Sequence, residues 1–330
     1  MIILAIESSC DETSIAILEN KKLLAHTIAS QIDIHKPFGG VVPEIASRHH
    51  EKIILSLIEK TLHEASLNIS AIDIFAVTHG PGLLGSLLVG LVTAKALALM
   101  YKKPLIGINH IEGHLLSALF EHDISFPFLG LIISGGHCIL YEVKDFGNYS
   151  TLGSTLDDAP GEAFDKVARL LNLGYPGGPI VEKRAREGTV DLRFPIPMKD
   201  DPSYNFSFSG LKTCVVNYLK KEASNPTDAL INNIAYSFQK SLIESLCIKS
   251  FRASQEKNIH CLVVTGGVAS NNTLRERFIH EGKKLTVDVY FPSKILCTDN
   301  AAMIGHVAYE KARRNLFDPL TIDACANLKL

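Results

Sequence analysis

Two histidines four positions apart offer the clearest chemistry in this chain of 330 residues. They stand in the run His110-Ile111-Glu112-Gly113-His114. Residues at i and i+4 share one face of a helix, so the two imidazole nitrogens can converge on one cation. The spacing therefore predicts a metal site. Because the chain has thirteen histidines, a chance pair stays open as the alternative.

The same run argues against a zinc peptidase. A peptidase of the HExxH type has its catalytic glutamate directly after the first histidine, where this chain has Ile111. Glu112 lies about 200° around a helix from His110, because a helix has 3.6 residues per turn. A peptidase site would therefore lack its general base.

Asp299 is the candidate for a third metal ligand. It stands in the polar run Cys297-Thr298-Asp299-Asn300, directly before a predicted helix. Two histidines and one carboxylate with open positions suit Fe(II) or Zn(II) as a Lewis acid. The alternative is that Asp299 only caps the helix, since aspartate is a preferred N-cap residue.

Three glycine-rich turns in the second half of the chain are candidates for holding a phosphate or a ribose. Glycine lets the backbone approach a ligand closely, and N–H groups at a helix start attract anions. Asp165 and Asn271 stand near these turns as possible partners of a ribose or a base. The combination favours a nucleotide site over three plain turns. The turns are Ser134-Gly135-Gly136, Gly177-Gly178 and Gly266-Gly267.

The order of strands and helices predicts an α/β fold in two related halves. A strand, a polar turn and a strand occupy residues 1–18, and the same pattern returns at 128–144. Helices and strands alternate after each pattern, which is typical of α/β proteins. We place the boundary near Ser125, giving a lobe of residues 1–125 and a nucleotide-binding lobe of residues 126–330. Part of the C-terminal helix is expected to pack back on the first lobe, and residues 191–212 are expected to be irregular.

Composition narrows the class of protein. A net charge of −2 excludes a globally basic nucleic-acid coat, but it leaves room for one basic strip. Seven scattered cysteines without a CxxC pair favour free thiols in a reducing cytoplasm over a zinc ribbon or disulfides. The N-terminus lacks the pattern of a signal peptide, and the apolar stretch 83–100 contains a lysine and small residues. We therefore expect a buried helix there and no membrane span.

Ten segments follow one another along the chain: AIESSCDETSIAI, GGVVPEIASRHH, THGPGLLGSLLVG, NHIEGHLLSA, LIISGGH, DDAPGEAFDKVARLL, YPGGP, FSFSGLKT, TGGVASNNTLR and CTDNAAMIG. In this order they resemble the TsaD/Gcp family of tRNA N6-adenosine threonylcarbamoyltransferases. The resemblance runs nearly end to end and implies the actin/Hsp70/sugar-kinase fold, with two lobes around a cleft.

The resemblance also implies an activity and its site. A threonylcarbamoyl group would pass from threonylcarbamoyl-AMP to the N6 amine of the adenosine next to the anticodon of certain tRNAs. His110, His114 and Asp299 would bind iron or zinc. The implied protein partners are a TsaB-like paralogue and a TsaE-like ATPase, and DNA is not expected to be a partner. The implied adenylate-binding residues are Ile132, Ile133, Ser134, Gly135, Gly136, Asp165, Gly178 and Asn271, and Glu182 stands where some members have an acidic contact to the nucleotide.

Two other functions remain as alternatives. A small-molecule kinase of the same fold would need Mg-ATP, and a site with two histidines does not suit Mg²⁺. A non-catalytic scaffold would bind the nucleotide only as a structural element. A metalloprotease is the least favoured reading, because the base is missing.

Asp11 and Glu12, in the first polar turn, are the candidates for accepting the proton that the attacking amine loses. Solvated turn acids are the alternative. We expect Asp11→Ala to slow threonylcarbamoyl transfer while donor binding is retained, measured as single-turnover transfer beside donor affinity. A full transfer rate in this variant, with wild-type donor binding, would remove Asp11 from the chemistry.

Overall fold

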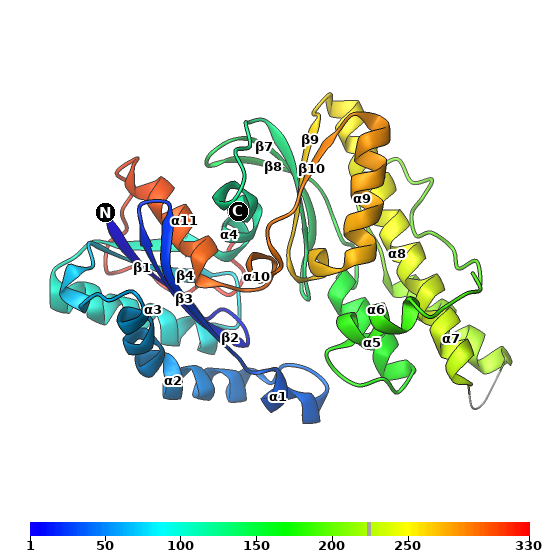
Figure 1. The fold of residues 1–330 in the computed structure, drawn as a ribbon, viewed down its shortest axis with the longest axis horizontal. Helices are drawn as coiled ribbons and strands as arrows, with labels where there is room; N and C mark the ends of the chain where they lie inside the picture. Colours follow the sequence, from blue (N-terminus) through cyan, green and yellow to red (C-terminus); the bar gives the residue numbers. More distant parts are fainter. Residues whose placement is uncertain (223–225) are drawn as a thin grey trace. The chain divides into compact units, whose positions relative to one another are not determined.

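The computed structural model describes residues 1–222 and 226–330. The chain divides into two compact units (Figure 1). The first unit contains Met1–Glu121 and Thr298–Leu330, and the second contains His122–Cys297. The division differs from the expected lobe of residues 126–330 in its last segment, Thr298–Leu330, which lies in the first unit. Helix α11 (Ala301–Ala312) explains this, because it packs on strands of the first unit.

The first unit has a five-stranded sheet in the order β3-β2-β1-β4-β5. Strands β1, β2 and β3 are antiparallel neighbours, whereas β4 and β5 continue the sheet in parallel with β1. The strands are β1 (Ile2–Glu7), β2 (Glu12–Glu19), β3 (Lys22–Ser30), β4 (Ile74–Gly80) and β5 (Leu105–Asn109). The helices are α1 (Ile32–His35), α2 (Pro43–Glu64), α3 (Leu84–Tyr101), α4 (His110–Leu116) and α11, with short 3-10 helices η1 (Lys36–Phe38), η2 (Ile69–Ala71) and η3 (Ser117–Phe120).

Helices cover both faces of this sheet, which is why β1 and β2 are almost continuously apolar. Helices α2 and α3 join one core with Leu4 and Ile6 of β1. Helix α11 packs on the opposite face, where Gly305 meets the side chain of Leu18. Helix α4, which carries both histidines, and the loop before α11, which carries Asp299, both belong to this unit.

The second unit repeats the same sheet, since its order β10-β9-β6-β7-β8 read backwards matches the first in position and direction. The duplication predicted from the strand–turn–strand patterns is therefore present. Its strands are β6 (Phe128–Ile133), β7 (Cys138–Asp145), β8 (Asn148–Ser154), β9 (Cys261–Thr265) and β10 (Asp288–Tyr290). Its helices are α5 (Pro160–Leu170), α6 (Gly177–Ala185), α7 (Ser209–Glu222), α8 (Asp228–Lys257), α9 (Asn272–Leu285), α10 (Lys294–Cys297) and the 3-10 helix η4 (Gly267–Ser270).

The sequence interpretation overlooked strands β3 and β8, each of which forms one of the two edges of its sheet. Both strands carry mostly half-buried or exposed residues. They therefore lack the apolar run that reveals an inner strand. The segment expected to be irregular, residues 191–212, also contains the start of helix α7 at Ser209.

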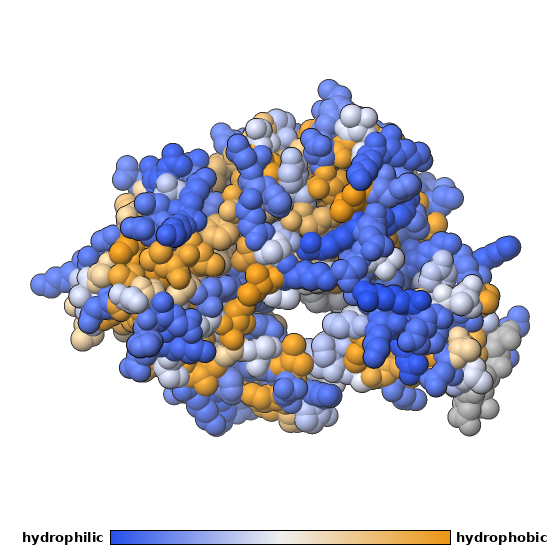
Figure 2. All heavy atoms as spheres, in the orientation of Figure 1, coloured by the Kyte–Doolittle hydropathy of each residue, from blue (hydrophilic) through white to orange (hydrophobic). Residues whose placement is uncertain are grey.

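Helix α3 is buried on one face only, which corrects the expectation of a buried helix at residues 83–100. Leu87 and Leu91 are inaccessible, but Leu88 is 39% exposed and Val92 is 59% exposed. By length and composition alone α3 is apolar enough to cross a membrane. In the structure it packs on α2 and β4. Hydrophilic residues cover most of the face in Figure 2, and apolar residues also reach the surface over the first unit.

Candidate functional site

Helix α4 positions the two histidines at the end of strand β5. The side-chain oxygen of Asn109 accepts hydrogen bonds from the backbone N–H groups of Ile111 (2.8 Å) and Glu112 (3.3 Å), so Asn109 caps the helix. The helix thus begins at His110, and His114 follows one turn later. Both histidines are at least 94% buried, at 6% and 1% exposed.

Asn300, and not Asp299, caps helix α11. The Asn300 side-chain oxygen accepts the Met303 N–H at 2.9 Å, and its amide donates to the Thr298 carbonyl at 2.8 Å. The backbone N–H of Ala301, the first residue of α11, donates to the hydroxyl of Ser14 at 2.9 Å. The capping alternative for Asp299 is therefore wrong, because its neighbour performs that task.

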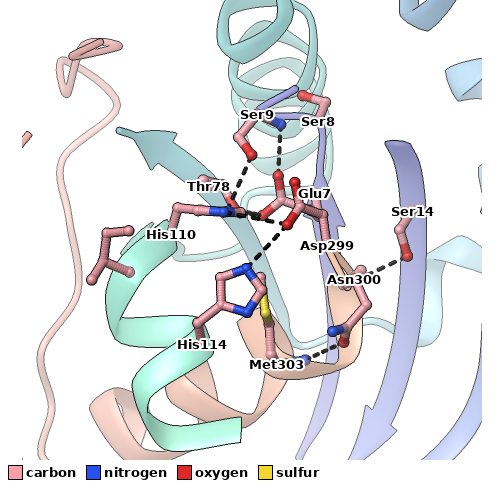
Figure 3. A network of polar contacts seen from close by, with 12 residues as sticks. Glu7, Ser8, Ser9, Ser14, Thr78, His110, His114, Asp299, Asn300 and Met303 are labelled. Atoms are coloured by element: carbon pink, nitrogen blue, oxygen red, sulfur yellow. Dashed lines mark hydrogen bonds and ion pairs between the residues drawn. The ribbon is translucent and has the colours of Figure 1, made fainter. Parts of the chain in front are cut away.

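The carboxylate of Asp299 meets both histidines (Figure 3). Its Oδ1 lies 3.0 Å from Nε2 of His114 and 3.5 Å from Nε2 of His110. One ligand atom from each of the three residues lies within 4.8 Å of the others. Two imidazole nitrogens and a carboxylate oxygen at these separations fit a divalent transition-metal ion. The structure thus brings together the three predicted ligands.

Burial and the neighbouring carboxylates shift the pKa of His110 in opposite directions. Burial lowers the pKa of His110, but the charges of Asp299 and Glu7 and the hydrogen bond to Glu7 raise it to about 9. A cation and a proton would compete for the same ring nitrogen, so a metal that bound here would have to displace a proton.

Glu7 is a site residue that the sequence analysis missed. It ends strand β1, is fully buried, and places Oε2 3.1 Å from Nδ1 of His110. Burial raises the pKa of Glu7, but His110 and the hydrogen bonds to the carboxylate lower it below the ordinary value overall. The available signal was an acidic residue at the end of an apolar strand, which sequence alone reads as the start of a polar turn.

Asp11 and Glu12 lie in the same unit as the metal-site residues. Asp11 is 9% exposed, and Glu12 accepts a hydrogen bond from the Ser30 hydroxyl at 3.2 Å. Burial raises the pKa of Glu12 well above its ordinary value, and the charges of Asp11 and Asp299 raise it further. This turn therefore lies within the electrostatic influence of Asp299.

The glycine turns of the second unit line a pocket with about 610 Å³ of empty space, including the part open to solvent. Five of the expected adenylate-binding residues line it: Gly135, Asp165, Gly178, Glu182 and Asn271. Four others lie outside its lining: Ile132 and Ile133 are buried in β6, and Ser134 and Gly136 flank Gly135 in the following turn. Gly267, from the third predicted glycine turn, also lines the pocket, together with residues that were not expected, namely Gly161, Phe164, Pro179, Val268 and Ser270.

The polar residues of this pocket also hold its backbone. Asp165 Oδ1 accepts the Gly177 N–H at 2.7 Å, and Asn271 caps α9 through the Leu274 N–H at 3.0 Å. Glu182 Oε1 accepts the backbone N–H of Asn272 at 3.0 Å. Helix starts with oriented N–H groups beside glycines are typical of phosphate sites.

Relatives of known name match almost the whole chain. The model of the family described as TsaD, tRNA N6-adenosine threonylcarbamoyltransferase, matches residues 22–306. A protein of that name from Clostridium kluyveri is 52% identical over 332 aligned residues, covering 99% of this chain and 97% of the relative. One from Kosmotoga olearia is 50% identical over 331 aligned residues, covering 100% and 99%.

Solved structures share the fold at low identity. HypF from T. kodakarensis has a TM-score of 0.64 at 13% identity, covering 96% of this chain and 48% of HypF. Component A of the (R)-2-hydroxyglutaryl-CoA dehydratase from Acidaminococcus fermentans has a TM-score of 0.58 at 16% identity, covering 95% and 99%. With the duplicated sheets, these neighbours define an α/β protein of the actin/Hsp70/sugar-kinase class.

Within this class the chain belongs to the TsaD family, as the motifs predicted. It is a transferase that acts on tRNA. The family implies a metal, and the His110–His114–Asp299 cluster has the donor set to hold one.

Gly113 allows α4 to lie close to α11, and this contact sets the distance between the histidines and Asp299. A Cβ at Gly113 would lie 3.0 Å from Cδ1 of Ile304 and 3.2 Å from Cγ of Met303. We expect Gly113→Ala to cost about 1–2 kcal/mol of unfolding free energy through overpacking and to weaken metal binding. Urea unfolding and metal content of the purified protein measure both effects.

The double variant Gly113→Ala/Ile304→Val is the matched control, because valine lacks the Cδ1 atom that the new methyl meets. It is expected to recover part of the metal content. Equal metal affinity in Gly113→Ala and the wild type would show that this helix contact does not set the site.

Proposed function

We propose that this transferase takes its threonylcarbamoyl group from threonylcarbamoyl-AMP and delivers it to the N6 amine of the adenosine next to the anticodon. The observation that carries the proposal is the His110–His114–Asp299 cluster in a chain of this family. The glycine-lined pocket supports it, because Gly135 and Gly178 leave room for a ligand beside backbone N–H groups.

The donor requires no protein nucleophile. It is a mixed carbamic–phosphoric anhydride, so the adenosine amine attacks the carbamoyl carbon, a C–N bond forms, and AMP leaves with the electrons of the broken C–O bond. Asp11 or Glu12 accepts the proton that the amine loses. His110, His114 and Asp299 would hold a divalent cation, Fe(II) or Zn(II), which would act as a Lewis acid toward the carbonyl or a phosphate oxygen. The pocket holds the adenylate through its glycine turns.

The resemblance extends to a TsaB-like paralogue and a TsaE-like ATPase as partners and to the cytoplasm as the place of reaction. The exposed apolar face of α3 is consistent with a protein partner, because Leu84, Leu88 and Val92 follow each other at helical spacing. The scattered free thiols agree with a reducing compartment.

Removing both histidines is the direct test of the metal. We expect His110→Ala/His114→Ala to stay folded, to purify without the metal, and to lose transfer of labelled threonine to tRNA by about a hundredfold or more. The assay contains the adenylate, the paralogue and the ATPase, and metal analysis accompanies it. His280→Ala, on the exposed side of α9, is the control. A folded, metal-free double variant that transfers normally would contradict the metal's role, and transfer without the partners would contradict their requirement.

Gly178 tests the nucleotide pocket. A Cβ there meets no atom within 4 Å, so Gly178→Ala is expected to fold normally while its methyl group occupies the pocket. Binding of AMP, measured by calorimetry, should weaken about tenfold. Gly210→Ala on α7 adds the same methyl group to open space away from this pocket and should bind AMP as the wild type does. Unchanged AMP affinity in Gly178→Ala would place the adenylate elsewhere.

A further inference from the structure

The carboxylate of Glu7 lies behind the metal site, enclosed by groups that can donate hydrogen bonds (Figure 3). Its Oε1 accepts the Ser9 N–H at 2.6 Å, and its Oε2 accepts the Thr78 hydroxyl at 2.5 Å. Nδ1 of His110 lies 3.1 Å from the same Oε2. Glu7 and Thr78 are both 0% exposed. An ionised carboxylate only accepts hydrogen bonds, so these contacts suit the charged form.

This acceptor determines which nitrogen of His110 carries the proton. A neutral imidazole has one N–H and one lone pair, and the group facing one nitrogen decides the state of the other. We propose that Glu7 is a positioning residue of the metal site: it accepts the Nδ1–H of His110 and so leaves the Nε2 lone pair for the cation. The inference rests on the proposed metal role of His110, His114 and Asp299.

The Nδ1 atoms of His110 and His114 have different surroundings. Nδ1 of His114 is buried without a hydrogen-bond partner among the described residues. Nδ1 of His110 faces Glu7 and, at 3.1 Å, the hydroxyl of Ser9. A carboxylate behind a ligating histidine fixes its orientation and strengthens it as a ligand. His110 is therefore the ligand whose ring is held in place by the fold.

Glu7→Gln keeps the shape of the side chain and reverses the hydrogen-bond pattern. The Ser9 N–H can only donate, so it holds the amide oxygen in the place of Oε1. The amide NH₂ then faces Nδ1 of His110, which has to accept, and the ring proton moves to Nε2. That proton occupies the lone pair that the metal requires.

The test compares zinc affinity and the protonated ring nitrogen in full-length protein. Metal-free wild type and Glu7→Gln are titrated with Zn²⁺ against a chelating dye, and we expect Glu7→Gln to bind about 10- to 100-fold more weakly. ¹⁵N-histidine NMR of the zinc-loaded wild type should show the His110 proton on Nδ1. His110→Gln assigns that resonance.

Glu112→Gln is the matched control. It removes the charge of another buried carboxylate, which lies on helix α4 and forms an ion pair with Lys311 at 3.3 Å. It should keep wild-type zinc affinity. Equal zinc affinity in Glu7→Gln and the wild type would overturn the inference. A wild-type His110 protonated on Nε2 would also overturn it, and that measurement does not depend on how well the variant folds. A wild-type chain that binds no zinc overturns the metal site itself.

Discussion

The fully buried carboxylate of Glu7 sets the arrangement of the polar interior of the first unit. A buried charge is costly unless hydrogen bonds and opposite charge surround it. Its partners are the Ser9 backbone, the Thr78 hydroxyl and the His110 ring, which come from the turn after β1, from β4 and from α4. These three elements therefore have to meet at one point. The histidine pair then lies where the N-terminal end of α11 brings Asp299.

The polar turn after the first strand of the repeated pattern contributes to a candidate site in each unit. In each unit a polar turn follows the first strand of the pattern, at residues 8–11 and at 134–137. The first turn lies beside Glu7 and the candidate metal ligand His110, and the second contributes Gly135 to the pocket. Loops at strand ends are free to vary, whereas the strands behind them are fixed by core packing. One architecture has thus acquired a candidate metal site in one unit and a nucleotide-type pocket in the other.

The three candidate metal ligands show how much of a site local sequence patterns can predict. His110 and His114 were predictable because their spacing within one helix decides their direction. Asp299 was a candidate with a competing role, and adjacent Asp299 and Asn300 are both good N-cap residues. Only the hydrogen bond that the Asn300 side-chain oxygen accepts from the Met303 N–H shows that Asn300 is the cap and leaves Asp299 as the candidate ligand. Glu7 escaped prediction because its partners Thr78 and His110 lie 71 and 103 residues away.

The sequence by itself determined the repeated strand–turn–strand pattern, the family motifs and the helical spacing of the histidines, because these depend on neighbours along the chain. The tertiary structure decided that the whole segment Thr298–Leu330 belongs to the first unit, that α3 keeps one face exposed, and that five rather than nine expected residues line the pocket. It also decided that Glu7 faces His110. These outcomes depend on the order of strands and the packing of helices, which bring together side chains that no local pattern connects.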